Sequence, residues 1–387
     1  MTMTINNEHK KLNVPNLRFP EFQGEWEKCR LGDVCTFLSG GTPKIDVKEY
    51  WNGTIPFVSA ISMHDTYILD SKLHISEEGL KHGSRLLTKN NLLLLVRGSM
   101  LWNTIPICLN KNDVAFNQDV KGIIANDTII NEFLLYWLKS KEQHLKYMVT
   151  GTGLGAGKLD TSDLLSMIIY IPAMIEQDKV ARLLSLFDER IATQSKIIDK
   201  LQSLIKGISS RIFTSIQGIE YRMGDIVTIT NGNSNVQDAV TQSKDGLYPF
   251  FDRSEDIKYL PTFLFDKEAI IYPGEGTEFM PRYFKGKFAL HQRCYAIFDF
   301  NEIINARFLY FYLKTRNSYF VKNAVGSTVP SLRLDTFQKL KVIIPSKEIQ
   351  HSVSLCLSSM EQKCNVEKKI LHKLLKQKQY LLRQMFI

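Results

Sequence analysis

Residues 171–213 read IPAMIEQDKVARLLSLFDERIATQSKIIDKLQSLIKGISSRIF, and this stretch decides how the rest of the chain is organised. After Pro172 it contains no other proline and a single glycine, so it can form one unbroken helix of about forty residues. Apolar residues recur at every seventh position on two adjacent lines, which is the pattern of a coiled-coil seam. The seam residues are Leu184, Ile191, Ile198, Ile205 and Ile212 on one line, and Val180, Phe187, Leu201 and Ile208 on the other.

A seam of this length requires a partner helix, and residues 348–386, which contain no proline, provide it. Ile344-Pro345 precedes this stretch as Ile171-Pro172 precedes the first. Its seam residues are Leu357, Cys364, Leu371 and Met385 on one line, which Lys378 interrupts, and Val353, Met360, Leu374 and Leu381 on the other. Helices of about forty residues are about 60 Å long. Packed antiparallel, they would hold the domains that precede them at opposite ends.

One polar residue occupies the corresponding seam position in each helix, Gln194 in the first and Glu367 in the second. Such residues can fix the register of a coiled coil at a cost in stability. They can equally be tolerated near a bend, and both interpretations stay open.

The parts of the chain that precede the two helices resemble each other, because six motifs recur in the same order. These are RLGDV 30–34 and RMGDI 222–226, GTIPF 53–57 and GLYPF 246–250, VRG 96–98 and YPG 272–274, FNQ 116–118 and LHQ 290–292, FLLYWLK 133–139 and FLYFYLK 308–314, and LDT 159–161 and LDT 334–336. A unit that is repeated in this way, a globule followed by a long helix, implies one architecture used twice.

Each globule combines short β-branched and aromatic runs, broken by Gly, Asn and Pro, with an amphipathic helix near Phe133 or Phe308. The predicted fold class is α+β: two mixed α/β domains in internal repeat, separated by two long helices that form an antiparallel coiled coil in a pseudo-two-fold arrangement. The predicted boundaries are 1–25 for an N-terminal segment, 26–172 for the first globule, 173–216 for the central helix, 217–345 for the second globule and 346–387 for the last helix.

The glycine-rich stretch VTGTGLGAGKLD at 149–160 resembles a nucleotide-binding loop. A phosphate loop needs Ser or Thr after its lysine, but Leu159 follows Lys158. The corresponding stretch of the second globule, 325–335, has one glycine, and its cation is Arg333. Small and hydroxyl-bearing residues beside one cation favour contact with a sugar-phosphate backbone. A purely structural loop is the main alternative, and nucleotide binding is disfavoured.

The formal net charge of +9 favours an acidic polymer as partner, because Lys and Arg displace counterions from phosphates. No apolar run approaches the roughly 20 residues that cross a bilayer, so we expect no membrane association. The start of the chain has no apolar segment of the secretory type, and the six cysteines form no CxxC pair. We therefore expect a cytoplasmic protein with free thiols and no metal site.

Residues 15–26, PNLRFPEFQGEW, are similar to the start of many specificity subunits of type I restriction-modification systems. The doubled plan of globule and helix resembles the same family, as do Glu176-Gln177 and Ile349-Gln350 after each Ile-Pro. The likeness covers essentially the whole chain.

The resemblance implies that each globule is a target recognition domain, which reads one half of a bipartite sequence in double-stranded DNA. It implies that the paired helices set the gap between the half-sites and dock two modification subunits, which methylate adenine at N6 with S-adenosylmethionine. Motor-nuclease restriction subunits would add cleavage driven by ATP and Mg²⁺. The chain itself is expected to bind none of these cofactors.

The sequence contains no amino-methyltransferase motif, no Walker A motif and no obvious nuclease carboxylates, so we expect a non-catalytic recognition subunit. An alternative is a coiled-coil scaffold that binds other proteins and has no sequence-specific affinity for DNA.

Side chains that read DNA are predicted from chemistry, since Arg suits guanine, Asn and Gln suit adenine, and amides or hydroxyls suit phosphate. In the first globule the candidates are Thr42, Lys44, Arg97, Ser99, Asn103, Asn117, Gln118 and Lys158. In the second they are Asn231, Asn233, Asn235, Arg253, Thr277, Arg282, His291, Gln292, Arg293 and Arg333.

Gln118 and Gln292 stand out because both copies keep a glutamine at this place in the repeat. A buried amide that holds the fold together would explain them equally well. His291 could suggest acid-base catalysis, but its counterpart is Asn117, which cannot titrate in that range, so catalysis there is not expected.

Overall fold

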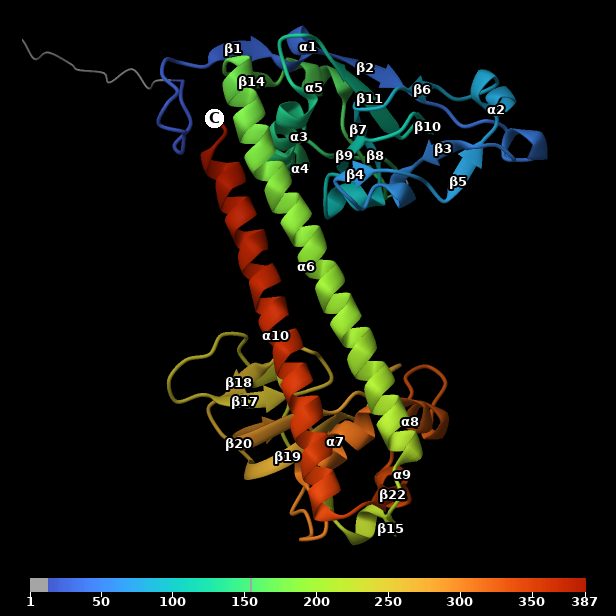
Figure 1. Ribbon diagram of the computed structural model, residues 1–387, viewed down its shortest axis with the longest axis vertical. Helices are drawn as coiled ribbons and strands as arrows, with labels where there is room; N and C mark the ends of the chain where they lie inside the picture. Colours follow the sequence, from blue (N-terminus) through green and yellow to red (C-terminus); the bar gives the residue numbers. More distant parts are fainter. Residues whose placement is uncertain (1–12, 154) are drawn as a thin grey trace, which may run out of the picture. The chain divides into compact units, whose positions relative to one another are not determined.

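The computed structural model describes residues 13–153 and 155–387 and divides the chain into two compact units. Unit 1 comprises Met1–Gln194 and Ile370–Ile387, and unit 2 comprises Ser195–Lys369. Each unit therefore contains one globule and a segment of each long helix, as Figure 1 shows. The first twelve residues of the predicted N-terminal segment, and Leu154 of the glycine-rich stretch, lie outside the described residues.

The globule of unit 1 contains a five-stranded sheet of order β2-β11-β7-β9-β4 and a four-stranded sheet of order β5-β3-β10-β6. Two smaller sheets pair β1 with β14, and β12 with β13 and β8. The strands are β1 (Glu27–Arg30), β2 (Cys35–Ser39), β3 (Ile55–Val58), β4 (Tyr67–Ile68), β5 (Leu73–Ile75), β6 (Leu86–Leu87), β7 (Leu92–Leu95), β8 (Arg97–Gly98), β9 (Ile107–Asn110), β10 (Val114–Phe116), β11 (Val120–Ala125), β12 (Thr150–Gly151), β13 (Gly157–Lys158) and β14 (Ile168–Ile171). The helices are α1 (Leu31–Val34), α2 (Glu77–Lys81), α3 (Asn131–Ser140), α4 (Glu142–Tyr147) and α5 (Thr161–Ser166).

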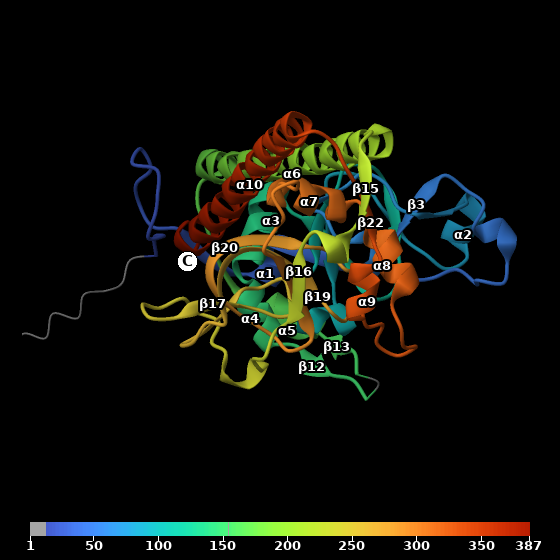
Figure 2. The ribbon, with the colours of Figure 1, turned by 90° about the horizontal axis from the view of Figure 1, so that it is seen from below.

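Unit 2 has one six-stranded sheet of order β16-β21-β19-β20-β17-β18, and β15 pairs with β22. The strands are β15 (Ile219–Arg222), β16 (Thr228–Asn231), β17 (Tyr248–Phe251), β18 (Lys258–Leu260), β19 (Phe265–Pro273), β20 (Arg282–Leu290), β21 (Cys294–Phe298) and β22 (Lys341–Ile344). The helices are α7 (Ala306–Lys314), α8 (Asn317–Asn323) and α9 (Leu334–Gln338). Within this unit α7 lies between the sheet and the long helices (Figures 1 and 2).

The repeated helix motif forms the centre of both cores. All six residues Phe133 to Leu138 of α3 are completely buried, and so are Phe308, Leu309 and Leu313 of α7. A short helix that is apolar on every side can bury its whole surface only if it lies between two layers of structure. In both units these layers are the sheet and the long-helix pair, since Phe133 shares one core with Leu184 of α6 and packs on Phe386 just after α10, and Phe308 packs on Phe213 of α6.

Main-chain hydrogen bonds confirm the internal repeat. The N–H of Asn117 donates to the carbonyl of Val58 at 3.1 Å, and that of His291 donates to the carbonyl of Phe251 at 2.9 Å. In both units these bonds follow a parallel strand pair, β3 with β10 in unit 1 and β17 with β20 in unit 2. The alignment of GTIPF with GLYPF and of FNQ with LHQ is therefore reproduced bond for bond.

A glycine follows β2 and another follows β16, and at both places the end of a neighbouring strand, β10 or β20, approaches too closely for a side chain. A Cβ on Gly40 would lie 2.3 Å from the carbonyl oxygen of Phe116, and a Cβ on Gly232 would lie 2.0 Å from that of Leu290. These glycines allow the loop after each strand to lie directly against the turn that carries Gln118 or Gln292.

Replacing Gly232 with alanine should lower the free energy of unfolding of unit 2 by about 1–3 kcal/mol, because the backbone must move to relieve the contact. Gly207 provides the control within the same unit: it is helical and has nothing within 4 Å of an added Cβ. Gly207→Ala should stabilise by about 0.5–1 kcal/mol through helix propensity alone. Urea unfolding measures both, and a Gly232→Ala variant as stable as the wild type would contradict the prediction.

The structure corrects two motif pairings, those of VRG with YPG and of LDT with LDT. Leu95 pairs with Val120, and the equivalent pair in unit 2 joins Pro273 to Cys294, so Arg97 corresponds to Glu275 rather than to Pro273. Likewise the N–H of Leu159 donates to Val96 and that of Leu332 donates to Gly274, both at 2.8 Å. Leu159 therefore corresponds to Leu332. Both motif alignments were therefore displaced by two residues. The sequence did not reveal this error, because a shift of two residues keeps side chains on the same face of a strand.

The two long helices form as expected, α6 over Met174–Ser215 and α10 over Lys347–Gln384. In unit 1 Leu184 is buried with Met385, and Asp188 forms an ion pair with Lys378. In unit 2 Ile212 and Phe213 lie in one core with Val353 and Leu357. The early part of each helix thus lies beside the late part of the other, which is antiparallel pairing. Seven predicted seam residues are buried, namely Val180, Leu184, Ile198, Leu357, Cys364, Leu374 and Met385. The half-buried ones are Phe187, Ile191, Leu201, Ile205, Ile212, Val353, Met360, Leu371 and Leu381. Ile208 is exposed, so the prediction that it is covered in the seam is wrong.

Each long helix begins with a buried glutamine that ties it to its globule. Gln177 accepts a hydrogen bond from the N–H of Ile130 at 2.8 Å and donates to the carbonyls of Thr128 and Pro172. Gln350 does the same in unit 2, with Asn305 as donor at 2.7 Å. Its side-chain N–H groups donate to the carbonyls of Ile303 and Pro345. The glutamine in each of the Glu-Gln and Ile-Gln pairs after Ile-Pro therefore connects the long helix to its globule.

The N-terminal stretch that resembles the family start forms a clamp on the first turns of α6. The Arg18 guanidinium donates to both oxygens of the Glu176 carboxylate, each at 2.7 Å, and the indole N–H of Trp26 donates to the same group at 3.3 Å. The N–H of Leu17 donates to the carbonyl of Gln384 at 2.9 Å. This segment therefore fastens the start of α6 to the end of α10 within unit 1.

Candidate nucleic-acid interface

In unit 1 three loops that are distant in sequence meet beside β8. The loop after β2 contacts the turn between β10 and β11, because Thr42 donates to the side-chain oxygen of Gln118 at 2.7 Å and the N–H of Gly41 donates to Phe116 at 3.0 Å. β13 adds Lys158, which pairs with Arg97 of β8. The candidates Thr42, Arg97, Gln118 and Lys158 are far apart in the sequence, and the fold brings them together.

A cavity of about 350 Å³ lies at this meeting point and is lined by Arg97, Gln118, Lys121 and Lys158. Lys121 donates to the hydroxyl of Ser39 at 2.6 Å, and Lys158 forms an ion pair with Asp160. Burial, and then the charge of Arg97, lower the pKa of Lys121. Three cations beside one exposed amide give a site that attracts an anionic, hydrogen-bonding ligand.

The other predicted residues of unit 1 differ in position. Thr42, Lys44, Ser99 and Asn103 are exposed on loops. Asn117 is buried at 9% exposure, and its side chain bonds the N–H and the carboxylate of Asp119. The prediction of Asn117 as a DNA contact is therefore not supported by its position, because its side chain holds the turn between β10 and β11 that carries Gln118.

In unit 2 the equivalent loops enclose a larger cavity of about 520 Å³. Four predicted residues line it, namely Arg253, His291, Gln292 and Arg293. Asn231 lies at its edge and donates to the carbonyl of Gln292 at 3.3 Å. Asn233, Asn235 and Thr277 are exposed on neighbouring loops. The repeat thus builds the same kind of polar site twice, with different residues.

This second site contains carboxylates as well as cations. Asp252 is buried at 5% exposure and receives bonds from Lys258 at 2.6 Å and from Ser254 at 2.6 Å. Burial acts to raise the pKa of Asp252, but these hydrogen bonds outweigh it, and the pKa is lowered. Burial lowers the pKa of His291. The lowered pKa favours the neutral imidazole, which can both donate and accept a hydrogen bond.

Arg282 and Arg333 are not among the residues that line the cavity of unit 2. Arg282 donates to the backbone carbonyls of Asp252 and Ser254 and lies 5.8 Å from the ring centroid of Phe251, so it holds the loop that carries Arg253. Arg333 is the exposed residue immediately before α9, at the position that Asp160 occupies before α5. The structural counterpart of Lys158 is Ser331. The prediction that Arg282 reads a base is not supported by this geometry.

Gln118 and Gln292 are both exposed. The alternative that they are buried amides is therefore wrong, and the amides that play this role are Gln177 and Gln350. Sequence reasoning also missed Lys121, Lys258 and Glu275 as members of the two sites. The repeat could have revealed Glu275, had the alignment of Arg97 not slipped by two residues.

Among residues 13–153 and 155–387 no group of His, Cys, Asp and Glu side chains is arranged to hold a metal ion. Within the same described residues, no helix has the length and apolar composition needed to cross a membrane.

Comparison with known proteins gives these sites a context. The family model for the type I restriction modification DNA specificity domain matches residues 23–203 and again 219–376. The specificity subunit of the Escherichia coli type I restriction enzyme EcoR124I/EcoR124II is 30% identical over 193 residues, which are 49% of this chain and 47% of that protein. The MjaIX specificity subunit of Methanocaldococcus jannaschii is 24% identical over 90% of this chain and 89% of that protein.

The chain thus spans about half the length of the E. coli relative and most of the M. jannaschii relative. The crystal structure of a type I restriction-modification S subunit from M. genitalium has the same fold, with a TM-score of 0.66 and 18% identity, over 97% of this chain and 99% of that one. These likenesses favour DNA specificity over the alternative of a scaffold. Because the specificity-domain model matches both halves of the sequence, the chain belongs to the type I restriction-modification DNA specificity family, the non-catalytic subunits that give such systems their sequence specificity.

Proposed function

We propose that each globule reads one half of a bipartite DNA target through the polar cavity at its loops, and that α6 and α10 set the gap between the halves. The observation that carries this proposal is the duplicated site. One scaffold presents Gln118 with Arg97 in unit 1 and Gln292 with Glu275 in unit 2. Equivalent backbone positions that carry different side chains are what two different half-sites require.

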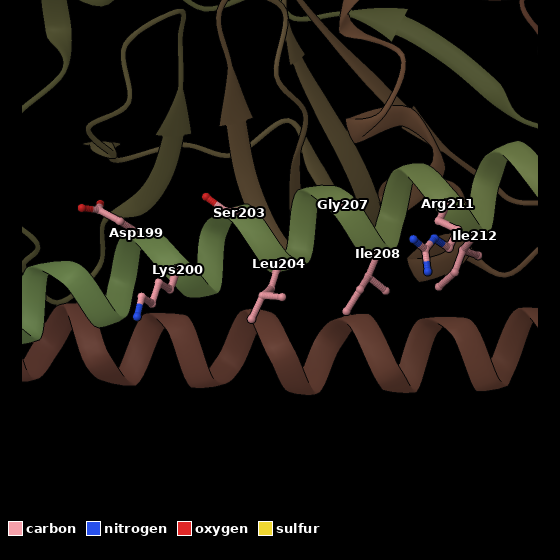
Figure 3. A pocket seen from close by; sticks show the side chains of 8 residues that line it. All are labelled: Asp199, Lys200, Ser203, Leu204, Gly207, Ile208, Arg211 and Ile212. Carbon is pink, nitrogen blue, oxygen red and sulfur yellow. The ribbon is translucent and has the colours of Figure 1, made fainter.

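The long helices support docking of partner subunits. The part of α6 that belongs to unit 2 lines an apolar groove of about 750 Å³, and Leu204 and Ile208 project from the same side of the helix (Figure 3). Leu204 is 54% exposed and Ile208 is 36% exposed. Apolar side chains in contact with water over several turns of one helix are typical of a protein interface.

A groove between the globule and its long helix occurs in both units. In unit 1 it is lined by Tyr67, Glu132 and Ser185, and in unit 2 by Tyr283, Arg307 and Ser358. A duplicated groove supports the proposal that two copies of one partner bind, which in this family would be the modification subunits. These partners would use S-adenosylmethionine, and restriction subunits would use ATP and Mg²⁺.

Mapping of N6-methyladenine in cells with and without this gene tests the proposed function. We expect one bipartite sequence to lose methylation when the gene is deleted. With the modification partner present, binding to that sequence should weaken steeply as the salt concentration rises, because cations at the sites release phosphate counterions. Methylation that is the same in both strains would refute the proposal and favour the scaffold alternative.

The helices are predicted to act as the spacer. Asp188 of α6 pairs with Lys378 of α10. Since the helices are antiparallel, Ile198, ten residues later in α6, lies opposite a residue close to Lys368 in α10. Removing seven residues at both places keeps the seam in register and shortens the helices by about 10 Å. We expect the gap to shorten by about three base pairs while each half-site stays the same. The methylated sequence of the variant provides the measurement, and an unchanged gap would refute the spacer role.

A further inference from the structure

Arg97 and Glu275 occupy the same backbone position in the two domains. Each lies two residues after a strand that pairs with the strand following the exposed glutamine: β7 pairs with β11 in unit 1, and β19 pairs with β21 in unit 2. Both are followed by a glycine with the same unusual backbone angle, φ +146° at Gly98 and +140° at Gly276. The two side chains therefore leave their sheets at equivalent points, one as a cation and the other as an anion.

The residue that follows each exposed glutamine is also reversed in charge. Asp119 follows Gln118 and accepts main-chain bonds from Val96 at 2.8 Å and Arg97 at 3.2 Å. Its counterpart after Gln292 is Arg293, whose guanidinium forms an ion pair with Glu275 at 2.8 Å. Each domain thus has one acidic and one basic residue beside its glutamine, with the two charges exchanged.

The environment of each side chain leaves it able to contact a ligand. Arg97 is exposed, and among the described residues no ion pair neutralises it. Glu275 is 18% exposed at its side chain, lines the cavity of unit 2 and is oriented by Arg293. A carboxylate is repelled by phosphates, so the DNA groups that it can favour are the amino groups of base edges. Arg97 can form a fork with the two acceptors of guanine.

We propose, on the basis of the proposed function, that Arg97 and Glu275 are equivalent specificity-determining residues that select opposite base edges. Arg97 selects guanine at one position of the first half-site. Glu275 selects a base that presents an amino donor, cytosine in the major groove, at the corresponding position of the second half-site. Gln118 and Gln292 lie beside them and read the adjacent position. The same backbone position thus selects a different base in each domain, because its side chain is positively charged in one and negatively charged in the other.

The test uses Arg97→Gln, Arg97→Lys and Glu275→Gln in the full chain together with its modification partner. N6-methyladenine mapping gives the methylated fraction of the wild-type target and of its single-base variants. We expect Arg97→Gln to reduce discrimination at one position of the first half-site by roughly 5- to 150-fold, and Glu275→Gln to do so in the second. Arg97→Lys should lose the same discrimination, because a lysine keeps the charge but not the fork.

Controls separate a reading role from a general effect of charge. Lys89→Gln and Glu302→Gln change exposed charges outside the two cavities and should leave every base preference unchanged. If Arg97→Lys restores wild-type discrimination, or if Arg97→Gln weakens methylation of all sequences equally, Arg97 contacts phosphate and the inference is overturned. Unaltered preferences in Glu275→Gln would overturn it as well. A wild-type chain that directs no bipartite methylation would instead refute the proposed function itself.

Discussion

Replacing Arg18 with alanine is expected to lower the free energy of unfolding of unit 1 by about 3–5 kcal/mol. The reason is that the Glu176 carboxylate, at 2% exposure, would stay in the interior without its bidentate partner. The indole N–H of Trp26 would remain as a donor at 3.3 Å, but a single neutral hydrogen bond does not offset the desolvation of a carboxylate. Hydrogen exchange at the amides of β1 and β14 reports the opening of this unit.

Two comparisons make the Arg18 prediction specific. Lys179 forms an ion pair with Glu21 nearby, with both side chains 46% exposed, so Lys179→Ala should cost less than about 1 kcal/mol. The double replacement Arg18→Met with Glu176→Leu should recover most of the loss, because no unpaired charge remains. Unit 2 has Ile349 where unit 1 has Glu176, so protection of β15 and β22 should not change. A loss below 1 kcal/mol for Arg18→Ala would contradict the prediction.

The architecture was predictable because it depends on patterns that extend over many residues. The heptad lines of residues 171–213 and 348–386 and the doubled order of motifs each combine tens of positions, so single exceptions do not disturb them. Lys378 is such an exception: it interrupts a seam line, and its contact with Asp188 explains why a charge is tolerated there. In unit 2 the equivalent carboxylate, Glu361, receives Lys314 instead. The lysine thus comes from α10 in unit 1 and from α7 in unit 2. Helix propensity and heptad periodicity cannot predict which of these two helices supplies it.

The candidate site was predictable only in part, because it depends on which loops meet. Arg97, Gln118 and Lys158 were selected from their chemistry, and the fold brings them to one cavity. Asn117 was selected by the same chemistry, but its amide is used to close the turn. Glu275 was not selected, because only cations, amides and hydroxyls were considered and because the motif alignment placed Pro273 opposite Arg97. Tertiary structure decides these assignments, since one polar side chain can serve a turn or a ligand equally well.

Exchanging residues 26–172 for the first domain of another family member is expected to change one half of the methylated sequence completely and leave the other half intact. The boundaries suit this experiment, because β1 and β14 pair along their whole length and both lie inside the exchanged piece. The exchanged piece meets the rest of unit 1 through one apolar core that includes Leu184 and Phe386, and through a few polar contacts. The main ones are Trp26 to Glu176, the Ile130 main chain to Gln177, and Tyr136 to Asp188 at 2.9 Å.

The donor domain should therefore keep a tryptophan and a tyrosine at the positions of Trp26 and Tyr136, because their loss would leave Glu176 and Asp188 with fewer donors in the interior. The matched control is the exchange of residues 217–345, which should change only the other half. Both chimaeras are scored by N6-methyladenine mapping, with the gap between the halves as an internal reference, since α6 and α10 are untouched. If either exchange altered both halves, the two cavities could not be independent readers, and recognition would have to depend on a surface that the domains share.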